Sequence, residues 1–188
     1  MAEIKNMDAV AALDAMDAHV DDWRDAVKGK QRGIFSFDDV AALKIKNLKK
    51  RIYTDIESIP AWKMKECIYK GVDDYEYLYD EWKELNVGDR WGNNGWSAFF
   101  KNSFDMPARF KGKKVTLNVY FGGDSLLTLN GEPYQGLDPF RNSVLLTECA
   151  KGDEHYDVDI ESYYVWHSNE STVKTLSCSF IGVVDPVI

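Results

Sequence analysis

Cysteine is scarce in this sequence of 188 residues, which contains only Cys67, Cys149 and Cys178. Three cysteines without a Cys-x-x-Cys pair are too few and too far apart to form a disulfide framework. Because disulfides are rare in reducing compartments, the odd count favours a cytoplasmic protein whose cysteines are buried free thiols.

Long apolar runs are also missing, since no stretch approaches the ~18 apolar residues expected of a membrane-spanning helix. The first ten residues, MAEIKNMDAV, lack the basic and apolar regions of a secretory signal. The net charge of −8, from 23 basic and 31 acidic residues, repels a phosphate backbone. We therefore expect neither a membrane partner nor a nucleic-acid partner.

Familiar catalytic and metal-binding motifs are absent as well. The histidines, His19, His155 and His167, do not occur in a His-x-His, His-Glu-x-x-His or Cys/His pattern, so no zinc site is predicted in this chain. There is neither a Gly-x-Ser-x-Gly elbow nor a P-loop. On these motifs, no catalytic residue is predicted.

One row of acids deserves comparison with glycoside hydrolases, which use pairs of carboxylates. Asp157, Asp159 and Glu161 occupy alternate positions of "DVDIES". Alternate positions of a strand face the same side, and three acids in a row are typical of the solvent face of a sheet. Catalysis by these acids is the alternative interpretation.

What the sequence does contain is apolar and aromatic: 45% of residues are hydrophobic and 13% are aromatic, which favours a folded β-sandwich. Residues 1–60 instead show the spacing of two amphipathic helices, and Pro60 ends the second. We expect this helical segment to form a hairpin or to lie across the edge of a sheet. The apolar positions that carry the pattern are Val10, Leu13, Met16, Val20, Trp23 and Val27, then Ala41, Ile45, Leu48, Ile52, Ile56 and Ile59.

From residue 61 onward the apolar period changes to two, which indicates strands. Val115, Leu117, Val119 and Phe121 fall on one face, as do Trp62, Met64 and Ile68. Asn130-Gly131 is typical of a type I′ hairpin turn. The segment 75–95 is rich in turn residues and is expected to be a long connection with a short helical turn. Residues 61–188 are thus predicted to be mainly β: an antiparallel sandwich of the jelly-roll or galactose-binding type, with seven or eight strands.

Two segments could contact a carbohydrate. In "GDRWGNNGWS" an aromatic ring could stack on a sugar while neighbouring amides bind hydroxyls. In "LNGEPYQGLDPFRN" a hairpin leads into a corner that could border a sugar pocket. The alternatives are that Trp91 plugs the end of the sandwich and that the corner belongs to the scaffold. The candidate carbohydrate contacts are Trp91, Asn94, Tyr134, Asp138 and Arg141.

The same two segments resemble the N-terminal β-domain of family-38 glycoside hydrolases, the α-mannosidases. The similarity extends over about residues 85 to 165 and includes the strand from Trp96 to Phe100, the Asn-Gly-x-Pro hairpin at Asn130 to Pro133, and Gln-Gly-Leu-Asp at Gln135 to Asp138. The resemblance implies a sandwich placed ahead of a zinc-dependent barrel that hydrolyses α-mannosides with retention. None of the barrel's motifs occurs in this sequence, so no catalytic residue or zinc ligand is transferred to it.

The resemblance therefore implies a non-catalytic accessory domain that packs on its own catalytic domain or supports homo-oligomerisation. The last residues, "GVVDPVI", are typical of a strand that leaves a domain, so we expect a fragment that ends before the barrel. Two other hypotheses stay open: an independent module that binds mannosides, and a free-standing hydrolase.

Overall fold

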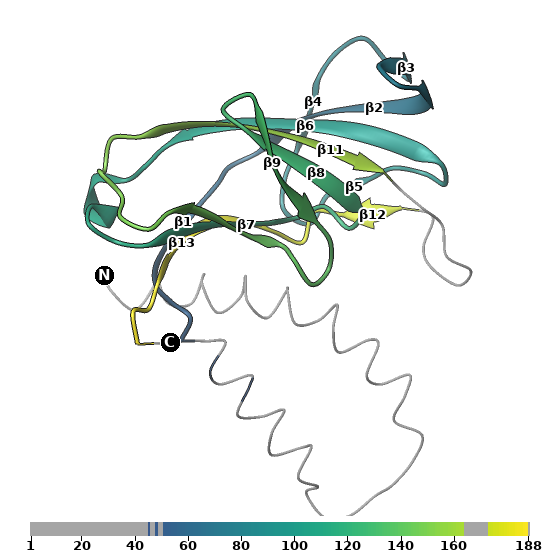
Figure 1. Ribbon diagram of the computed structural model, residues 1–188. Helices are drawn as coiled ribbons and strands as arrows, with labels where there is room; N and C mark the ends of the chain where they lie inside the picture. The colour runs from purple at the N-terminus through teal and green to yellow at the C-terminus, as the bar shows by residue number, and fades with distance from the viewer. Residues whose placement is uncertain (1–44, 46–47, 49–50, 164–172, 188) are drawn as a thin grey trace, which may run out of the picture.

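The computed structural model describes residues 45, 48, 51–163 and 173–187. The strands between Tyr53 and Val184 form a β-sandwich (Figure 1). One sheet has four strands, in the order β1 (Tyr53–Ser58), β13 (Cys178–Val184), β7 (Val115–Tyr120) and β10 (Ser143–Thr147). The other has seven: β3 (Asp74–Tyr77), β2 (Trp62–Gly71), β6 (Trp96–Asp105), β11 (His155–Tyr163), β8 (Asp124–Leu129) and β9 (Glu132–Leu137), with β4 (Lys83–Leu85) paired to β2.

All pairings between the described strands are antiparallel, which confirms the predicted antiparallel sandwich. A small ribbon of β5 (Arg90–Trp91) and β12 (Lys174–Thr175) lies at one end. A single turn of 3-10 helix, η1 (Ala108–Phe110), follows β6. Within the described residues, no helix has the length and apolarity needed to cross a bilayer.

The core lies between the two sheets, where alternate residues of each strand meet. Val115, Leu117 and Val119 of β7 are completely buried in this core, on one face of the strand as predicted. The residues between them are buried as well, so β7 is covered on both faces. Next to them, the ring of Phe121 stacks on Phe100 from β6, with centroids 3.9 Å apart. The edge of Trp62 meets the same Phe121 ring at 5.1 Å. Aromatic rings from both sheets therefore join the two layers at their centre.

The predicted hairpin between β8 and β9 is confirmed. Both of its turn residues have positive φ, 51° at Asn130 and 84° at Gly131, as a type I′ turn requires. The side chain of Asn130 also bonds away from the hairpin, since its Oδ1 accepts the Asp157 N–H at 2.9 Å. This bond fixes the hairpin tip against the start of β11.

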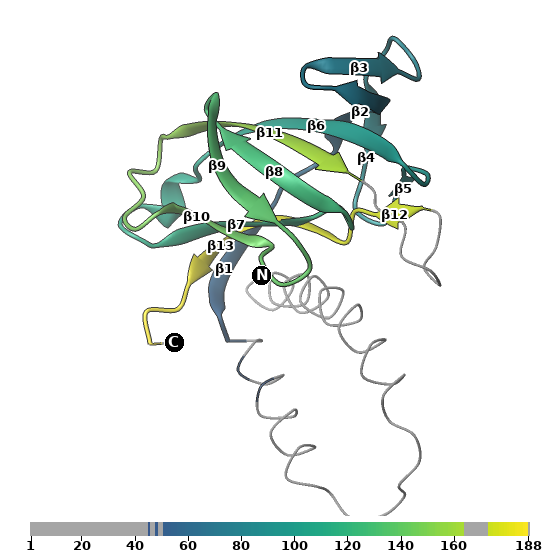
Figure 2. The same cartoon turned by 45° about the vertical axis from the view of Figure 1, so that its right-hand side comes forward.

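The expectation of a long connection with a helical turn at residues 75–95 is wrong, because three short strands form there. The long strand β2 offers an edge that no single neighbour fills: Trp62–Met64 pair with β4 and Cys67–Gly71 pair with β3. The β2–β3 end rises away from the body of the sandwich (Figure 2). Ile68, in this half of β2, is accordingly only half-buried, whereas Trp62 and Met64 are buried as predicted.

Most of the helical lead-in expected over residues 1–60 falls outside the described residues. Ile45 and Leu48, which are described, are helical. Residues 53–58, however, form strand β1, so the second predicted helix does not continue to Ile59. Repeats of four residues, such as Ile52 to Ile56, fit both a helix and one face of a strand. Pairing with β13 favours the strand, and Gly182 of β13 leaves room for the Tyr53 ring, which a Cβ there would meet at 2.5 Å.

Candidate functional site

Trp91, the first candidate for sugar contact, lies in the core. Only 2% of the residue is exposed, and its Nε1 donates a hydrogen bond to the carbonyl of Phe121 at 2.6 Å. Its ring meets Phe100 edge to face at 5.1 Å. A buried ring cannot offer a face to a sugar, so the expected stacking role of Trp91 is wrong. The alternative interpretation, in which Trp91 plugs the sandwich, describes its position.

The turn after Trp91 is held by a buried carboxylate that the sequence analysis missed. Glu66 of β2 accepts the Gly92 N–H at 2.6 Å and the hydroxyl of Tyr79 at 3.1 Å. Asn94, in the same turn, is exposed, and its N–H donates to Asn93 Oδ1 at 2.8 Å. Asn94 is thus accessible to a ligand, but the Trp91 ring is buried and cannot bind the same ligand. Glu66 lies on the same face of β2 as Trp62, Met64 and Ile68, so an acid within the apolar register was the sequence signal that could have identified it.

The corner between β9 and β10 brings together two of the predicted residues, Asp138 and Arg141. Arg141 Nη2 lies 2.6 Å from Asp138 Oδ2, and its Nε donates to the same oxygen at 2.7 Å. The other carboxylate oxygen accepts the N–H groups of Phe140 and Arg141 at 2.8 and 2.9 Å. These bonds, led by the one from the Arg141 side chain, lower the pKa of Asp138 below its usual value. The corner is therefore a rigid, charge-assisted turn.

Tyr134, also predicted to contact sugar, connects the two sheets. Its hydroxyl donates to the carbonyl of Leu145 in β10 at 2.7 Å, and Gln135 donates to the Ser143 carbonyl at 3.2 Å. The ring stays 50% exposed. The strand β9 is thereby tied to β10 on the side of the sandwich that leads to the corner.

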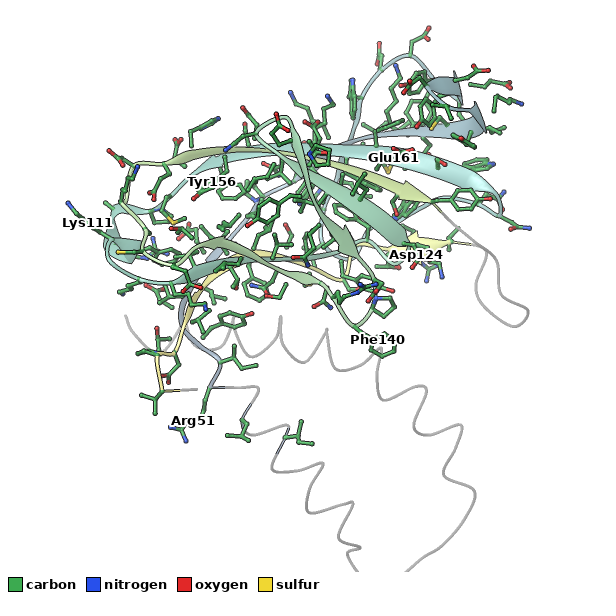
Figure 3. All side chains as sticks on the ribbon, viewed as in Figure 1. Arg51, Lys111, Asp124, Phe140, Tyr156 and Glu161 are labelled. Atoms are coloured by element: carbon green, nitrogen blue, oxygen red, sulfur yellow. The ribbon has the colours of Figure 1, made fainter. Side chains whose placement is uncertain are left out.

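The most exposed aromatic residue of this corner, Phe140, was not predicted. It is 88% exposed and lies on the opposite side of the sandwich from Glu161 (Figure 3). Its backbone is held by the Asp138 carboxylate, so the ring projects from an ordered turn. An apolar residue inside the polar string "DPFRN" is the only sequence signal that could have pointed to it.

The row of acids on β11 faces outward, as predicted, and the acids have separate partners. Asp159 pairs with Lys101 at 3.1 Å, and Glu161 accepts the Tyr75 hydroxyl at 2.7 Å. Asp157 lies 3.4 Å from His155 Nε2, whose other ring nitrogen lies 2.7 Å from Asp105. The hydrogen bond to Asp105 is the main cause that raises the pKa of His155. In the described part of the chain, no group of three histidine, cysteine or acidic side chains is placed to hold a metal.

Together, the two facing antiparallel sheets and the ordered corner that joins them define a jelly-roll β-sandwich domain. Residues 55–177 match the family described as "Alpha-mannosidase, jelly roll domain". The chain belongs to this family, which confirms the resemblance to α-mannosidases found in the sequence.

Among characterised proteins, the chain is 27% identical to α-mannosidase G of Dictyostelium discoideum over 97 residues. That alignment covers 49% of this chain and 9% of the relative, so the chain spans a small part of that enzyme's length. Among solved structures, it is similar to the β-glucuronidase of Ruminococcus gnavus with a TM-score of 0.47 and 10% identity, covering 71% of this chain and 29% of that one. The complex of that enzyme with D-glucuronic acid gives a TM-score of 0.45 and 12% identity, covering 71% of this chain and 30% of that one.

Proposed function

We propose that this chain is a non-catalytic accessory domain of an α-mannosidase and that it packs against the enzyme's catalytic domain. The family supports the enzyme class. The observation that carries the docking role is Phe140, an aromatic ring 88% exposed on an ordered corner. Pre-ordered aromatic residues are typical anchors of protein interfaces, because little conformational entropy is lost when they are buried.

The arrangement of the acids supports a role without catalysis. A retaining glycosidase needs two carboxylates that act together on one glycosidic bond. Here Asp159 and Glu161 are engaged by different partners, Lys101 and Tyr75. Both acids lie on the outer, partly exposed face of β11.

The remaining parts of the proposal concern the partner. We propose that zinc and the retaining chemistry belong to the catalytic domain, because the described residues of this chain offer no set of metal ligands. We also propose a cytoplasmic enzyme, in keeping with three free cysteines, and a second use of the corner in homo-oligomerisation.

A second candidate function is sugar binding at the corner itself. The half-exposed ring of Tyr134 favours it, with Asp138, Arg141 and the more distant Asn94 as polar contacts. Titration with mannose and mannobiose measures this directly. Loss of binding in Tyr134→Phe as well as Tyr134→Ala would point to the hydroxyl, and loss in Tyr134→Ala alone to the ring; no binding at tens of millimolar sugar would rule the corner out.

The docking proposal is tested by mixing the chain with the catalytic region of an α-mannosidase from the same genome and measuring association by sedimentation velocity. Phe140→Ala is expected to weaken association about tenfold, the scale of one interface anchor. Val72→Ala is the matched control, since Val72 is also highly exposed but lies in the β2–β3 turn. Equal affinities in both variants, or no association of the unaltered chain, would contradict the proposal.

A further inference from the structure

The outer face of the seven-stranded sheet contains a hollow of about 720 Å³. It lies over β2, β6 and β11 and reaches the tip of the β8–β9 hairpin. Phe140 and the corner lie on the other side of the sandwich (Figure 3), so this hollow is separate from the proposed docking surface. Its volume falls within the range typical of small-molecule sites. The side chains that matter here are Lys63, Lys101, Asn130, His155, Asp157 and Asp159.

These side chains mix hydrogen-bond donors with acceptors at close range. The Lys101–Asp159 pair, 3.1 Å apart, leaves both side chains about half exposed, at 53% and 45%. A carboxylate has about four acceptor positions and an ammonium three donors, so one contact leaves most of their capacity unused. A ligand hydroxyl can therefore accept a hydrogen bond from the Lys101 ammonium and donate one to the Asp159 carboxylate.

Lys63 adds a second ammonium directly opposite Lys101 in the register of β2 and β6. Each lysine also faces an acid across its other strand pairing, Lys63 opposite Glu84 of β4 and Lys101 opposite Asp159 of β11, so the outer face presents charges of both signs. In the described part of the chain, Lys63 forms no ion pair. On the facing side, Asn130 uses its Oδ1 for the Asp157 N–H, so its amide donors stay available to a ligand.

An aromatic ring stands close to these polar groups. Lys101 Nζ lies 5.4 Å from the centre of the Trp82 ring, and Trp82 is 39% exposed. Unlike Trp91, this indole has surface that a ligand can reach. A flat ring beside paired donors and acceptors suits a molecule with one apolar face and many hydroxyls.

We propose that this hollow binds a neutral oligosaccharide, with Lys63, Lys101, Asp157 and Asp159 at its hydroxyls. Trp82 lies outside the lining of the hollow but beside Lys101, where its ring can stack on a sugar unit that extends past the hollow. An anionic ligand is disfavoured by Asp157 and Asp159, and a lone cation by the two lysines. A neutral polyol uses both kinds of group, because each hydroxyl donates to a carboxylate and accepts from an ammonium. The site does not depend on the docking role of Phe140.

The test is a titration of the ¹⁵N-labelled chain with mannobiose and, separately, cellobiose, followed by NMR. Binding of either disaccharide should shift resonances of β6, β11 and the β8–β9 turn. Trp82→Ala should weaken binding about tenfold, the scale of one stacked ring, and Asp159→Asn, which keeps the side-chain shape, should weaken it several-fold. Phe140→Ala is the control for an exposed aromatic residue elsewhere and should leave the affinity unchanged.

No binding of either disaccharide up to ~100 mM, well above millimolar affinities, would overturn the proposal. So would binding that both Trp82→Ala and Asp159→Asn leave intact, or shifts confined to the corner at Tyr134 and Arg141. Because the docking experiment is read through Phe140→Ala, failure of the sugar site and failure of the docking role give different results.

Discussion

Both carboxylate oxygens of Asp138 bind Arg141: one lies 2.6 Å from Arg141 Nη2, and the other accepts the backbone N–H of Arg141 at 2.9 Å. The same residue is thus bound through both its side chain and its backbone. This arrangement orders the corner between the two sheets without burying the Arg141 side chain, which is 73% exposed.

Asp138→Ala should lower the free energy of unfolding by about 1 kcal/mol. The loss reflects the backbone hydrogen bonds, while water screens most of the ion pair. Asp138→Asn is the matched control, because an amide oxygen can still accept the N–H groups of Phe140 and Arg141. Urea denaturation of both variants measures the difference. If Asp138→Asn costs as much as Asp138→Ala, the ion pair and not the turn bonds holds the corner.

The stabilising effect of Asp138 should also depend on pH. Its pKa is lowered in the folded state, so the folded protein binds a proton there less readily than the unfolded chain does. The stability difference between wild type and Asp138→Asn should therefore be fully present above the unfolded pKa of about 3.9 and decline as pH falls through the lower folded value. Denaturation at several pH values checks this. A difference that grows on acidification would contradict the assigned sign.

Trp91→Phe should destabilise the domain by about 2–3 kcal/mol, since it leaves a cavity and an unpaired Phe121 carbonyl. Trp82→Phe, a change of the same chemistry at a partly exposed position, should change stability by less than about 0.5 kcal/mol. Chemical denaturation compares the two. Equal stabilities would mean that the buried indole bond contributes nothing and would remove the reason for placing Trp91 in the scaffold.

Local chemistry and strand period predicted the parts of the fold that depend on neighbours in sequence. The Asn130-Gly131 turn is such a case and is confirmed, and Val115, Leu117 and Val119 lie together in the core as predicted. That the residues between them are buried too depends on tertiary packing, which strand period does not predict. Strand β1 was missed because four-residue spacing is shared by a helix face and a strand face, and only pairing with β13 decides between them.

The candidate site was predicted less well, because exposure depends on tertiary partners. Trp91 is buried by Phe100 and the carbonyl of Phe121, which are distant in sequence, so its flanking amides gave a false indication of a sugar site. Phe140 is exposed because the Asp138 turn holds it outward, which no periodicity encodes. The Asp138–Arg141 pair, three residues apart, was within reach of sequence reasoning.

Thiol reactivity should separate the three cysteines. Burial raises the pKa of Cys67 to about 11 and that of Cys178 to about 12, whereas Cys149 is exposed. Because the thiolate is the nucleophile, the two buried thiols are almost wholly protonated at pH 8. A thiol-specific disulfide reagent should therefore modify Cys149 alone in the native protein and all three cysteines in urea. Rapid modification of a second cysteine without denaturant would show that the sandwich opens locally.

The central claim, that this α-mannosidase jelly-roll domain contributes structure and binding but no hydrolysis, is tested most directly with an aryl α-mannoside. The pure chain should release no aryl alcohol above the buffer rate, with or without added zinc. Turnover that a single carboxylate change, Asp159→Asn or Glu161→Gln, abolishes would contradict the account and assign the chemistry to this chain.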